Sequence, residues 1–208
     1  MTRKPGFLFV ITAPSGAGKT TLITRLRQEF PQIRFSVSTT TRPPRAGEVH
    51  GRDYFFVDHQ TFSDMVARDA FVEWAHIHGN DYGTSREYVE AALEGGDEVL
   101  FDIDVQGFRA LRAQLGPRAN YVFIAPPSLE TLGRRLAGRG TESPESLALR
   151  LKNARAEMEA AGEFDFIVVN DDLETAYGEL RAAYLACHLR PRYRAGLLPA
   201  PGQDSHEG

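Results

Sequence analysis

One stretch near the N-terminus, FLFVITAPSGAGKTTLITRL from Phe7 to Leu26, constrains the fold of this chain most strongly. It begins with the apolar run Phe7 to Ile11, which is too short for a helix and is typical of a strand buried on both faces of a parallel sheet. A glycine-rich turn follows, and after it Leu22, Ile23 and Leu26 recur at helical spacing. A strand, a glycine-rich turn, Lys-Thr and a helix together form the phosphate-binding P-loop in the context that this motif requires.

The residue types in this turn suit a polyphosphate. Gly16 and Gly18 let backbone N–H groups point inward, where they form an anion site together with the helix N-terminus. Lys19 is expected to reach the β and γ phosphates, and the Thr20 hydroxyl to bind Mg²⁺. Ala13 stands where the strict motif has glycine, which is tolerable if its φ is negative. The predicted triphosphate-binding residues of the turn are Ala13, Pro14, Ser15, Gly16, Ala17, Gly18, Lys19 and Thr20.

Length and composition favour a soluble chain with one domain and an insertion, or at most two small domains. The 208 residues carry a net charge of −4, which argues against general nucleic-acid binding, and no apolar run approaches membrane-spanning length. Arg3 and Lys4 precede the first apolar run as in a secretory signal, but that run is shorter than the apolar part of such signals. The single cysteine, Cys187, suits a reducing cytoplasm, and its place in a helical pattern predicts a buried core residue.

Further buried strands alternate with helical patterns along the chain. Runs typical of such strands cover residues 98–103, 121–125 and 164–169. Asp102 and Asp104 follow the first of these runs, at the strand end where ligands collect in parallel sheets and where P-loop proteins place an acidic residue near Mg²⁺. This alternation predicts a doubly wound parallel sheet with two inserted pieces above its C-terminal edge.

Both inserted pieces are rich in arginine. In the first, Arg42, Arg45 and Tyr54 could clamp a phosphate dianion, although a solvated arginine-rich loop fits the spacing equally well. His76 and His78 lie in a predicted hairpin, and without a third ligand of matching spacing they are interpreted as polar surface rather than a metal site. The second piece suits a flap over phosphates, with a pair of helices bearing solvated arginines as the alternative. Its arginines are Arg134, Arg135, Arg139, Arg150 and Arg155.

Several segments beyond the P-loop carry a family resemblance. They are SVSTTTRPPRAGEVHGRDY, FVEWAHIHGNDYGTS, LFDIDVQG, APPSLETLGRRLAGRGTESPESLALR and FDFIVVNDDLETAYGEL. In order and spacing they resemble guanylate kinases over most of residues 7–190. The resemblance implies a three-layer α/β/α fold of the P-loop NTPase type with a parallel sheet, a mixed α/β GMP-binding domain and a helical lid. The implied ranges are 5–37, 97–128 and 160–190 for the core, 38–96 for the GMP-binding domain, 129–159 for the lid and 191–208 for a flexible tail.

The resemblance also assigns residues to roles. A carboxylate such as Glu73 can accept from both N1–H and the exocyclic amine of guanine, a donor pair that adenine lacks. The implied guanine-reading residues are Ser38, Glu73, Thr84 and Asp104, and the phosphate-binding residues are Arg42, Arg45, Tyr54 and Tyr82. Glu48 and Asp102 are added to the GMP site, Asn170 to the ATP site, and Thr20 and Asp102 to the Mg²⁺ site. The implied catalytic residues are Lys19, Arg45, Arg139 and Arg150.

The resemblance implies a cytoplasmic enzyme of purine metabolism that transfers the γ-phosphate of ATP to GMP with Mg²⁺, giving ADP and GDP. Its expected partners are ATP and GMP, with dGMP left open; no nucleic acid, membrane or obligate protein partner is expected. Two alternatives remain at this point. One is a protein-binding module with this fold that has lost catalysis, and the other is a P-loop kinase for a different phosphorylated acceptor.

Overall fold

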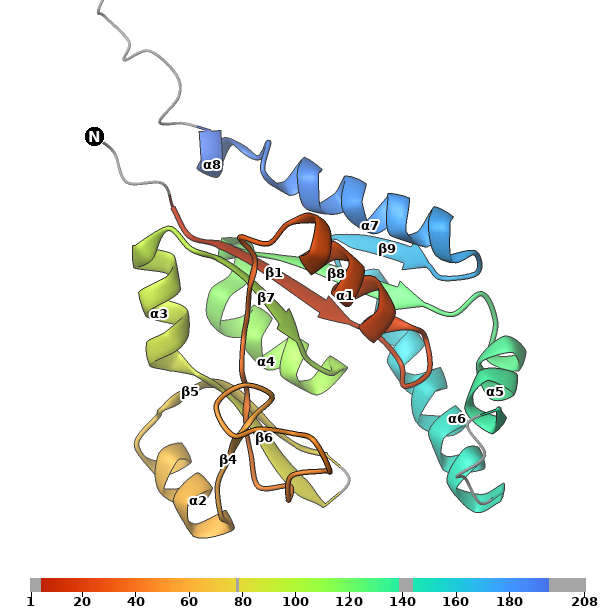
Figure 1. The fold of residues 1–208 in the computed structure, drawn as a ribbon, viewed down its shortest axis with the longest axis horizontal. Helices are drawn as coiled ribbons and strands as arrows, with labels where there is room; N and C mark the ends of the chain where they lie inside the picture. Colours follow the sequence, from red (N-terminus) through yellow and green to blue (C-terminus); the bar gives the residue numbers. More distant parts are fainter. Residues whose placement is uncertain (1–4, 78, 139–143, 195–208) are drawn as a thin grey trace, which may run out of the picture.

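Two sheets organise the part of the chain that the computed structural model describes, residues 5–77, 79–138 and 144–194. The larger sheet has five strands in the order β2-β7-β1-β8-β9, and every pairing in it is parallel. Figure 1 shows it crossing the centre of the molecule, with helices on both faces. Its strands are β1 (Phe7–Thr12), β2 (Arg34–Phe35), β7 (Glu98–Asp102), β8 (Ala119–Ala125) and β9 (Phe166–Val169). The predicted doubly wound parallel sheet is therefore confirmed.

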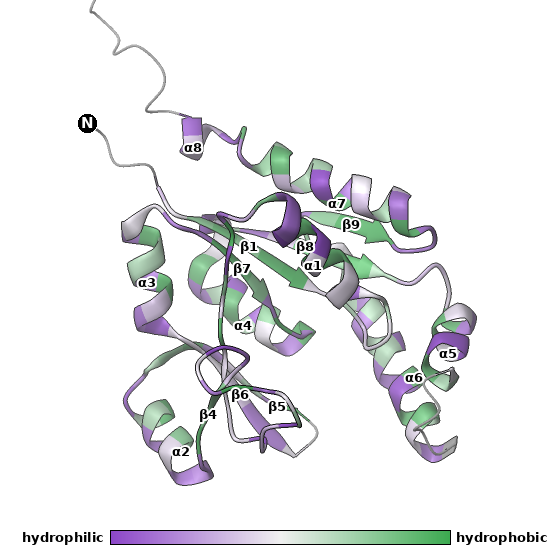
Figure 2. Cartoon of the chain, viewed as in Figure 1, coloured by the Kyte–Doolittle hydropathy of each residue, from purple (hydrophilic) through white to green (hydrophobic). Residues whose placement is uncertain are grey.

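The strand β1 is buried on both faces, which explains its unbroken apolar sequence. Phe9 and Ile11 point into a cluster with the helices α1 and α7, whereas Leu8 and Val10 point into a second cluster with α3 and α4. Cys187 lies fully buried in the first cluster, as predicted, and burial raises the pKa of its thiol to about 11. Figure 2 shows hydrophobic residues concentrated in the central strands. The four helices are α1 (Lys19–Glu29), α3 (Arg86–Gly95), α4 (Val105–Leu115) and α7 (Leu173–Cys187).

The smaller sheet belongs to the first inserted piece, at the lower left of Figure 1. Its strand order is β4-β3-β6-β5, and β5 and β6 form the predicted antiparallel hairpin, with β5 at the edge. The helix α2 accompanies this sheet, and Phe62 of α2 stacks on Phe71 of β5 with ring centroids 4.7 Å apart. The elements are β3 (Thr39–Thr40), β4 (Phe55–Phe56), α2 (His59–Ala67), β5 (Phe71–Ile77) and β6 (Asn80–Ser85).

The second inserted piece is a helical hairpin at the lower right of Figure 1. It consists of α5 (Leu129–Ala137) and α6 (Pro144–Glu159). Leu132, Leu136 and Ala154 form a small buried cluster of their own between the two helices. The two inserted pieces form separate units, at the lower left and the lower right of Figure 1. Two short 3₁₀ turns, η1 (Gly116–Arg118) and η2 (Ala160–Glu163), precede β8 and β9.

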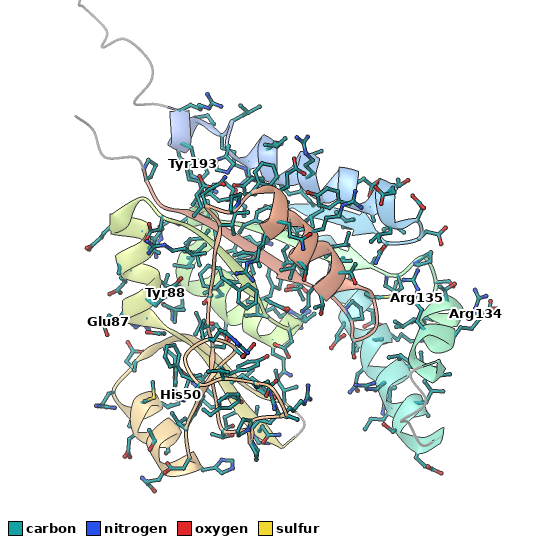
Figure 3. All side chains as sticks on the ribbon, in the orientation of Figure 1. His50, Glu87, Tyr88, Arg134, Arg135 and Tyr193 are labelled. Carbon is teal, nitrogen blue, oxygen red and sulfur yellow. The ribbon has the colours of Figure 1, made fainter. Side chains whose placement is uncertain are left out.

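The C-terminal segment differs from the predicted flexible tail in its first residues. Pro191–Arg194 forms a helical turn, α8, and Tyr193 is buried. Tyr193, labelled in Figure 3, lies with its ring centroid 5.1 Å from that of Phe7, and its hydroxyl accepts a hydrogen bond of 3.1 Å from the Asn120 side chain. Burying one aromatic ring orders this turn. The prediction of a flexible tail was therefore wrong for 191–194, and residues 195–208 lie outside the described part of the chain.

Candidate functional site

The P-loop between β1 and α1 presents open backbone donors. Gly16 and Gly18 have φ values of 92° and 91°, which L-residues with a β-carbon rarely adopt. No side chain caps the N-terminus of α1, whereas Asp104 caps α4 and Asp172 caps α7. Within the described part of the chain, the first N–H groups of α1 and its positive dipole end therefore have no side-chain acceptor, as an anion site requires. Among the described residues the only non-glycine with positive φ is Asp69, so Ala13 causes no strain.

The loop is supported from behind by Asn170, which follows β9. The buried side-chain amide of Asn170 donates a 2.7 Å hydrogen bond to the carbonyl of Ala17. A β-carbon at Gly18 would lie 2.2 Å from the same amide nitrogen, so glycine is needed there for space as well as for φ. Asn170 was predicted to bind ATP; the structure places its amide against the back of the loop.

A cleft of about 450 Å³ opens in front of the loop and joins all three parts of the molecule. Its wall includes P-loop residues, strand-end residues of the large sheet, side chains of the small sheet and two residues of α6. Of the predicted site residues, it is lined by Ala13, Pro14, Ser15, Gly16, Gly18, Lys19, Thr20, Ser38, Tyr54, Glu73, Tyr82, Asp102, Asp104 and Arg150. Positions that are far apart in sequence therefore meet in a single cavity of the size that small-molecule sites have.

Lys19 and Asp102 form an ion pair at the floor of the cleft. Lys19 extends from the first turn of α1, and its ammonium group also lies 3.5 Å from the carbonyl oxygen of Ile103. Asp102 closes β7, next to β1 in the sheet, so the parallel register brings the two side chains together. A phosphate arriving at the loop would exchange one anionic partner of Lys19 for another.

Glu73 is a buried carboxylate in the wall formed by β5. Its side chain accepts a 2.5 Å hydrogen bond from the Thr84 hydroxyl, across the β5–β6 hairpin. Only 6% of Glu73 is exposed, and burial, followed by the nearby Asp104 carboxylate, raises its pKa to about 7. A β-carbon at Gly107 would lie 2.8 Å from a Glu73 carboxylate oxygen, so the glycine lets this group approach α4 closely. A carboxylate held this way suits a ligand that offers it hydrogen-bond donors.

Asp104 lies beside Glu73 and is held by α4. It is the N-cap residue of that helix, and one carboxylate oxygen accepts a 2.8 Å hydrogen bond from the Gly107 N–H. The same residue lines the cleft, so it combines a capping role with exposure to a ligand. The predicted guanine-reading residues Ser38, Glu73 and Asp104 thus line the same cleft, and Thr84 supports Glu73 from behind without lining it.

The arginine-rich loop of the first inserted piece is organised around Glu48. One carboxylate oxygen of Glu48 accepts from the Arg42 guanidinium at 2.8 Å, and the other accepts from the Arg45 backbone N–H at 2.7 Å. The hydrogen bond to Glu48 raises the pKa of Arg42 above its ordinary value. Arg42 also lies 5.3 Å from the ring of Tyr54, which lines the cleft with Tyr82. Arg42 therefore lies against a residue of the cleft wall without lining the cleft, and Arg45 is exposed and does not line it either.

The inward face of α6 contributes two side chains to the cleft. Arg150, a predicted catalytic residue, and Glu157 both line it, two helical turns apart. Burial, followed by the Asp104 carboxylate, raises the pKa of Glu157 to about 7. Figure 3 shows Arg134, on α5, extending outward at the edge of the molecule, so the arginines of this piece do not all face the cleft. Arg139 lies outside the described residues.

The sequence reasoning missed Glu157. Its helical register with Arg150 and Ala154 was visible at spacings of seven and three residues, and that signal could have found it. The predicted residues that do not line the cleft are Ala17, Arg42, Arg45, Glu48, Thr84 and Asn170. Of these, Thr84 donates a hydrogen bond to Glu73 in the cleft wall. Asn170 donates to Ala17 of the P-loop, and Glu48 accepts from Arg42.

The donors available for a metal are few. No group of three or more His, Cys, Asp or Glu side chains suited to a metal ion occurs among residues 5–77, 79–138 and 144–194. The Thr20 hydroxyl and the Asp102 carboxylate share the cleft, and both are oxygen ligands of the kind that Mg²⁺ takes together with substrate phosphates and waters. They fit a magnesium ion that arrives with a nucleotide. His76 pairs with Asp81 at 2.7 Å and His78 is not described, so the polar-surface interpretation of the pair stays a prediction.

Comparisons with known proteins point to one family over nearly the whole chain. The family model described as guanylate kinase matches residues 6–186. A guanylate kinase of Oleidesulfovibrio alaskensis is 52% identical over 201 residues, covering 97% of each chain. One of Nitratidesulfovibrio vulgaris is 52% identical over 195 residues, covering 94% of each. The crystal structure of guanylate kinase from Anaplasma phagocytophilum superposes with a TM-score of 0.74 at 29% identity, covering 93% of this chain and 92% of that one.

Proposed function

The chain belongs to the guanylate kinase family, and we propose that the cleft between its P-loop, its small sheet and α6 is where it transfers the γ-phosphate of ATP to GMP. The reaction gives ADP and GDP. The observation that carries this assignment of the site is the meeting of Lys19, Glu73 and Arg150 in one cavity, although they come from three separate parts of the chain. The P-loop is the ATP side, and the small sheet is the GMP side.

Guanine is read by the wall around Glu73. Its ionised carboxylate accepts from N1–H and from the exocyclic amine, while Thr84 keeps it in position and Asp104 and Ser38 contribute further polar groups. A base without this donor pair leaves buried acceptors unsatisfied, which can discriminate by about 10⁴-fold. Tyr54, Tyr82, Arg42 and Arg45 bind the phosphate of GMP, and Glu48 sets the geometry of the arginine loop.

Transfer requires alignment and charge neutralisation rather than a base. The nucleophile is a phosphate oxygen of GMP, which is already an anion, so no side chain has to remove a proton. Lys19 and Arg150, joined by Arg45 and Arg139, neutralise charge on the transferred group and its neighbours. Closure of α5–α6 over the cleft excludes water and brings the two polyanions into line.

Magnesium belongs to the same site. Thr20 would hold it directly, with Asp102 nearby, once Lys19 exchanges its ion pair with Asp102 for a phosphate contact. When bound, the ion neutralises and orients the β and γ phosphates. The remaining chemistry is carried by Lys19 and the arginines.

The chain acts on small molecules in the cytoplasm. Its proposed partners are ATP and GMP, without nucleic acid or an obligate protein partner. The net charge of −4 supports the exclusion of nucleic acid. Within the described residues, no helix has the length and apolar character needed to cross a bilayer.

The test is a coupled assay of ADP release with ATP and Mg²⁺ and with GMP, AMP, CMP or UMP as acceptor. We expect turnover with GMP and rates lower by about 10³-fold or more with the other three. Lack of turnover with GMP would favour a protein-binding module of this fold. Comparable rates with another acceptor would assign the cleft to a different monophosphate.

A further inference from the structure

Four carboxylates line the cleft, and three of them have protein partners. Asp102 pairs with Lys19, Asp104 accepts from the Gly107 N–H, and Glu73 accepts from Thr84. Glu157 forms no hydrogen bond or ion pair with any residue in the described part of the chain, yet its side chain lines the cleft. A half-buried carboxylate that faces a substrate site and has no donor among the described residues is placed to accept from the substrate.

The position of Glu157 along the cleft narrows the choice of substrate group. The two charged groups that act on its carboxyl are Asp104 and Lys19. Asp104 belongs to the wall that reads the base, and Lys19 lies at the end where phosphate is transferred. The part of a nucleotide that joins its base to its phosphate is the ribose.

The chemistry of GMP points to the same group. Its phosphate offers only acceptor oxygens, which repel a carboxylate, and the ring N–H and amine donors of its base are matched to Glu73. The donors that remain are the two ribose hydroxyls, which lie side by side and match the two oxygens of a carboxylate. We propose that Glu157 reads the sugar of the acceptor nucleotide, its carboxylate accepting hydrogen bonds from the ribose hydroxyls of GMP. This inference rests on the proposed function, because it takes GMP as the acceptor.

Burial makes the Glu157 carboxylate depend on hydrogen-bond donors from a ligand. The pKa of Glu157 is raised to about 7, first by burial and then by the Asp104 carboxylate, so hydroxyl donors would compensate an ionised form that these two effects disfavour. Glu157 also shares its helix with Arg150. Sugar binding by Glu157 would therefore draw α6 towards the acceptor, together with the arginine that serves the phosphates.

The experiment is isothermal titration calorimetry with GMP and dGMP, in the presence of ADP so that no turnover occurs. The proteins are wild type, Glu157→Ala, the near-isosteric Glu157→Gln, and Glu159→Ala as the control. Glu159 is exposed on the same helix and does not line the cleft. Thermal unfolding of each variant checks that it is folded.

We expect wild type and Glu159→Ala to bind GMP about tenfold more tightly than dGMP, since the 2′-hydroxyl is one of two charge-assisted contacts. In Glu157→Ala the two affinities should become equal, with GMP losing most, and Glu157→Gln should fall between. An unchanged GMP-to-dGMP ratio in Glu157→Ala, or no preference in wild type, would overturn the proposal. An unchanged ratio with an altered Mg²⁺ dependence of ATP binding would assign Glu157 to metal-bound water instead, and would also overturn it. Failure of the proposed function is a different result, namely no binding of GMP by wild type.

Discussion

Replacing Glu73 by Gln should stabilise the free protein at alkaline pH while weakening GMP binding. Glu73 is 6% exposed, and its pKa is raised from 4.5 to about 7, first by burial and then by Asp104. Because the folded state holds this proton more tightly than the unfolded state, the group's contribution to stability is complete below pH 4.5. It is lost as pH rises from 4.5 through about 7. The displaced pKa corresponds to about 3 kcal/mol, and Gln removes that ionisation cost.

The assay is urea unfolding followed by circular dichroism at several pH values between 5 and 8. The free energy of unfolding of Glu73→Gln minus that of wild type should rise across this range by up to about 3 kcal/mol in favour of the variant. Glu90→Gln is the control, because Glu90 is exposed on α3, and its difference from wild type should stay flat. A difference for Glu73→Gln that does not change with pH would refute the claim that burial raises the pKa of this carboxyl.

The same variant should lose affinity for GMP by about 10²-fold or more, because two hydrogen bonds to a charged acceptor are removed. ATP affinity should stay within about twofold of wild type, since Glu73 lies on the acceptor wall. Calorimetry with each nucleotide measures both values. A gain in stability combined with a loss of binding is the behaviour expected of a residue kept for function. Equal losses for GMP and ATP would instead indicate a general disturbance of the cleft.

Three further predictions concern the phosphate groups, the arginine loop and the core. Arg150→Ala should lower kcat by about 10³-fold or more with little change in the thermal midpoint, measured by ADP release and by thermal unfolding; a kcat within tenfold of wild type would remove Arg150 from the transfer step. Glu48→Gln should raise the KM for GMP by about tenfold but not that for ATP, in steady-state kinetics, because Arg42 and Arg45 lose their common anchor; equal KM changes would contradict this. Phe108→Ala should lower the free energy of unfolding in urea by about 3–5 kcal/mol, because Phe108 is fully buried and its ring centroid lies 3.7 Å from that of Phe164. A loss below about 1 kcal/mol would show that the surrounding core repacks.

The parallel sheet and the P-loop could be predicted from the sequence because each gives a local pattern. Continuous apolar runs marked β1, β7 and β8, and the glycines with Lys19 marked the turn. The strands β3 and β4 have two residues each, too few for a periodic signal. The run predicted to begin at Phe164 starts as strand β9 only at Phe166, since Phe164 instead stacks on Phe108.

The acceptor wall could not be worked out from local pattern. Glu73 and Thr84 meet across a hairpin, and Asp104 joins them from the N-terminus of α4, so their grouping came from family resemblance alone. Glu157 was missed because it looks like one more charge on a charged helix. Tyr193 was missed because a single aromatic residue in a polar tail gives no period, although its burial orders the turn around it.

The central claim is that a triphosphate at the P-loop and a guanine nucleotide at Glu73 occupy one continuous cleft. Inhibition by adenosine and guanosine joined through a chain of phosphates tests it most directly. One inhibitor should bind per chain and compete with both ATP and GMP, and Glu73→Gln should weaken inhibition by at least about 10²-fold. Competition with ATP alone, or inhibition unaffected by Glu73→Gln, would contradict it.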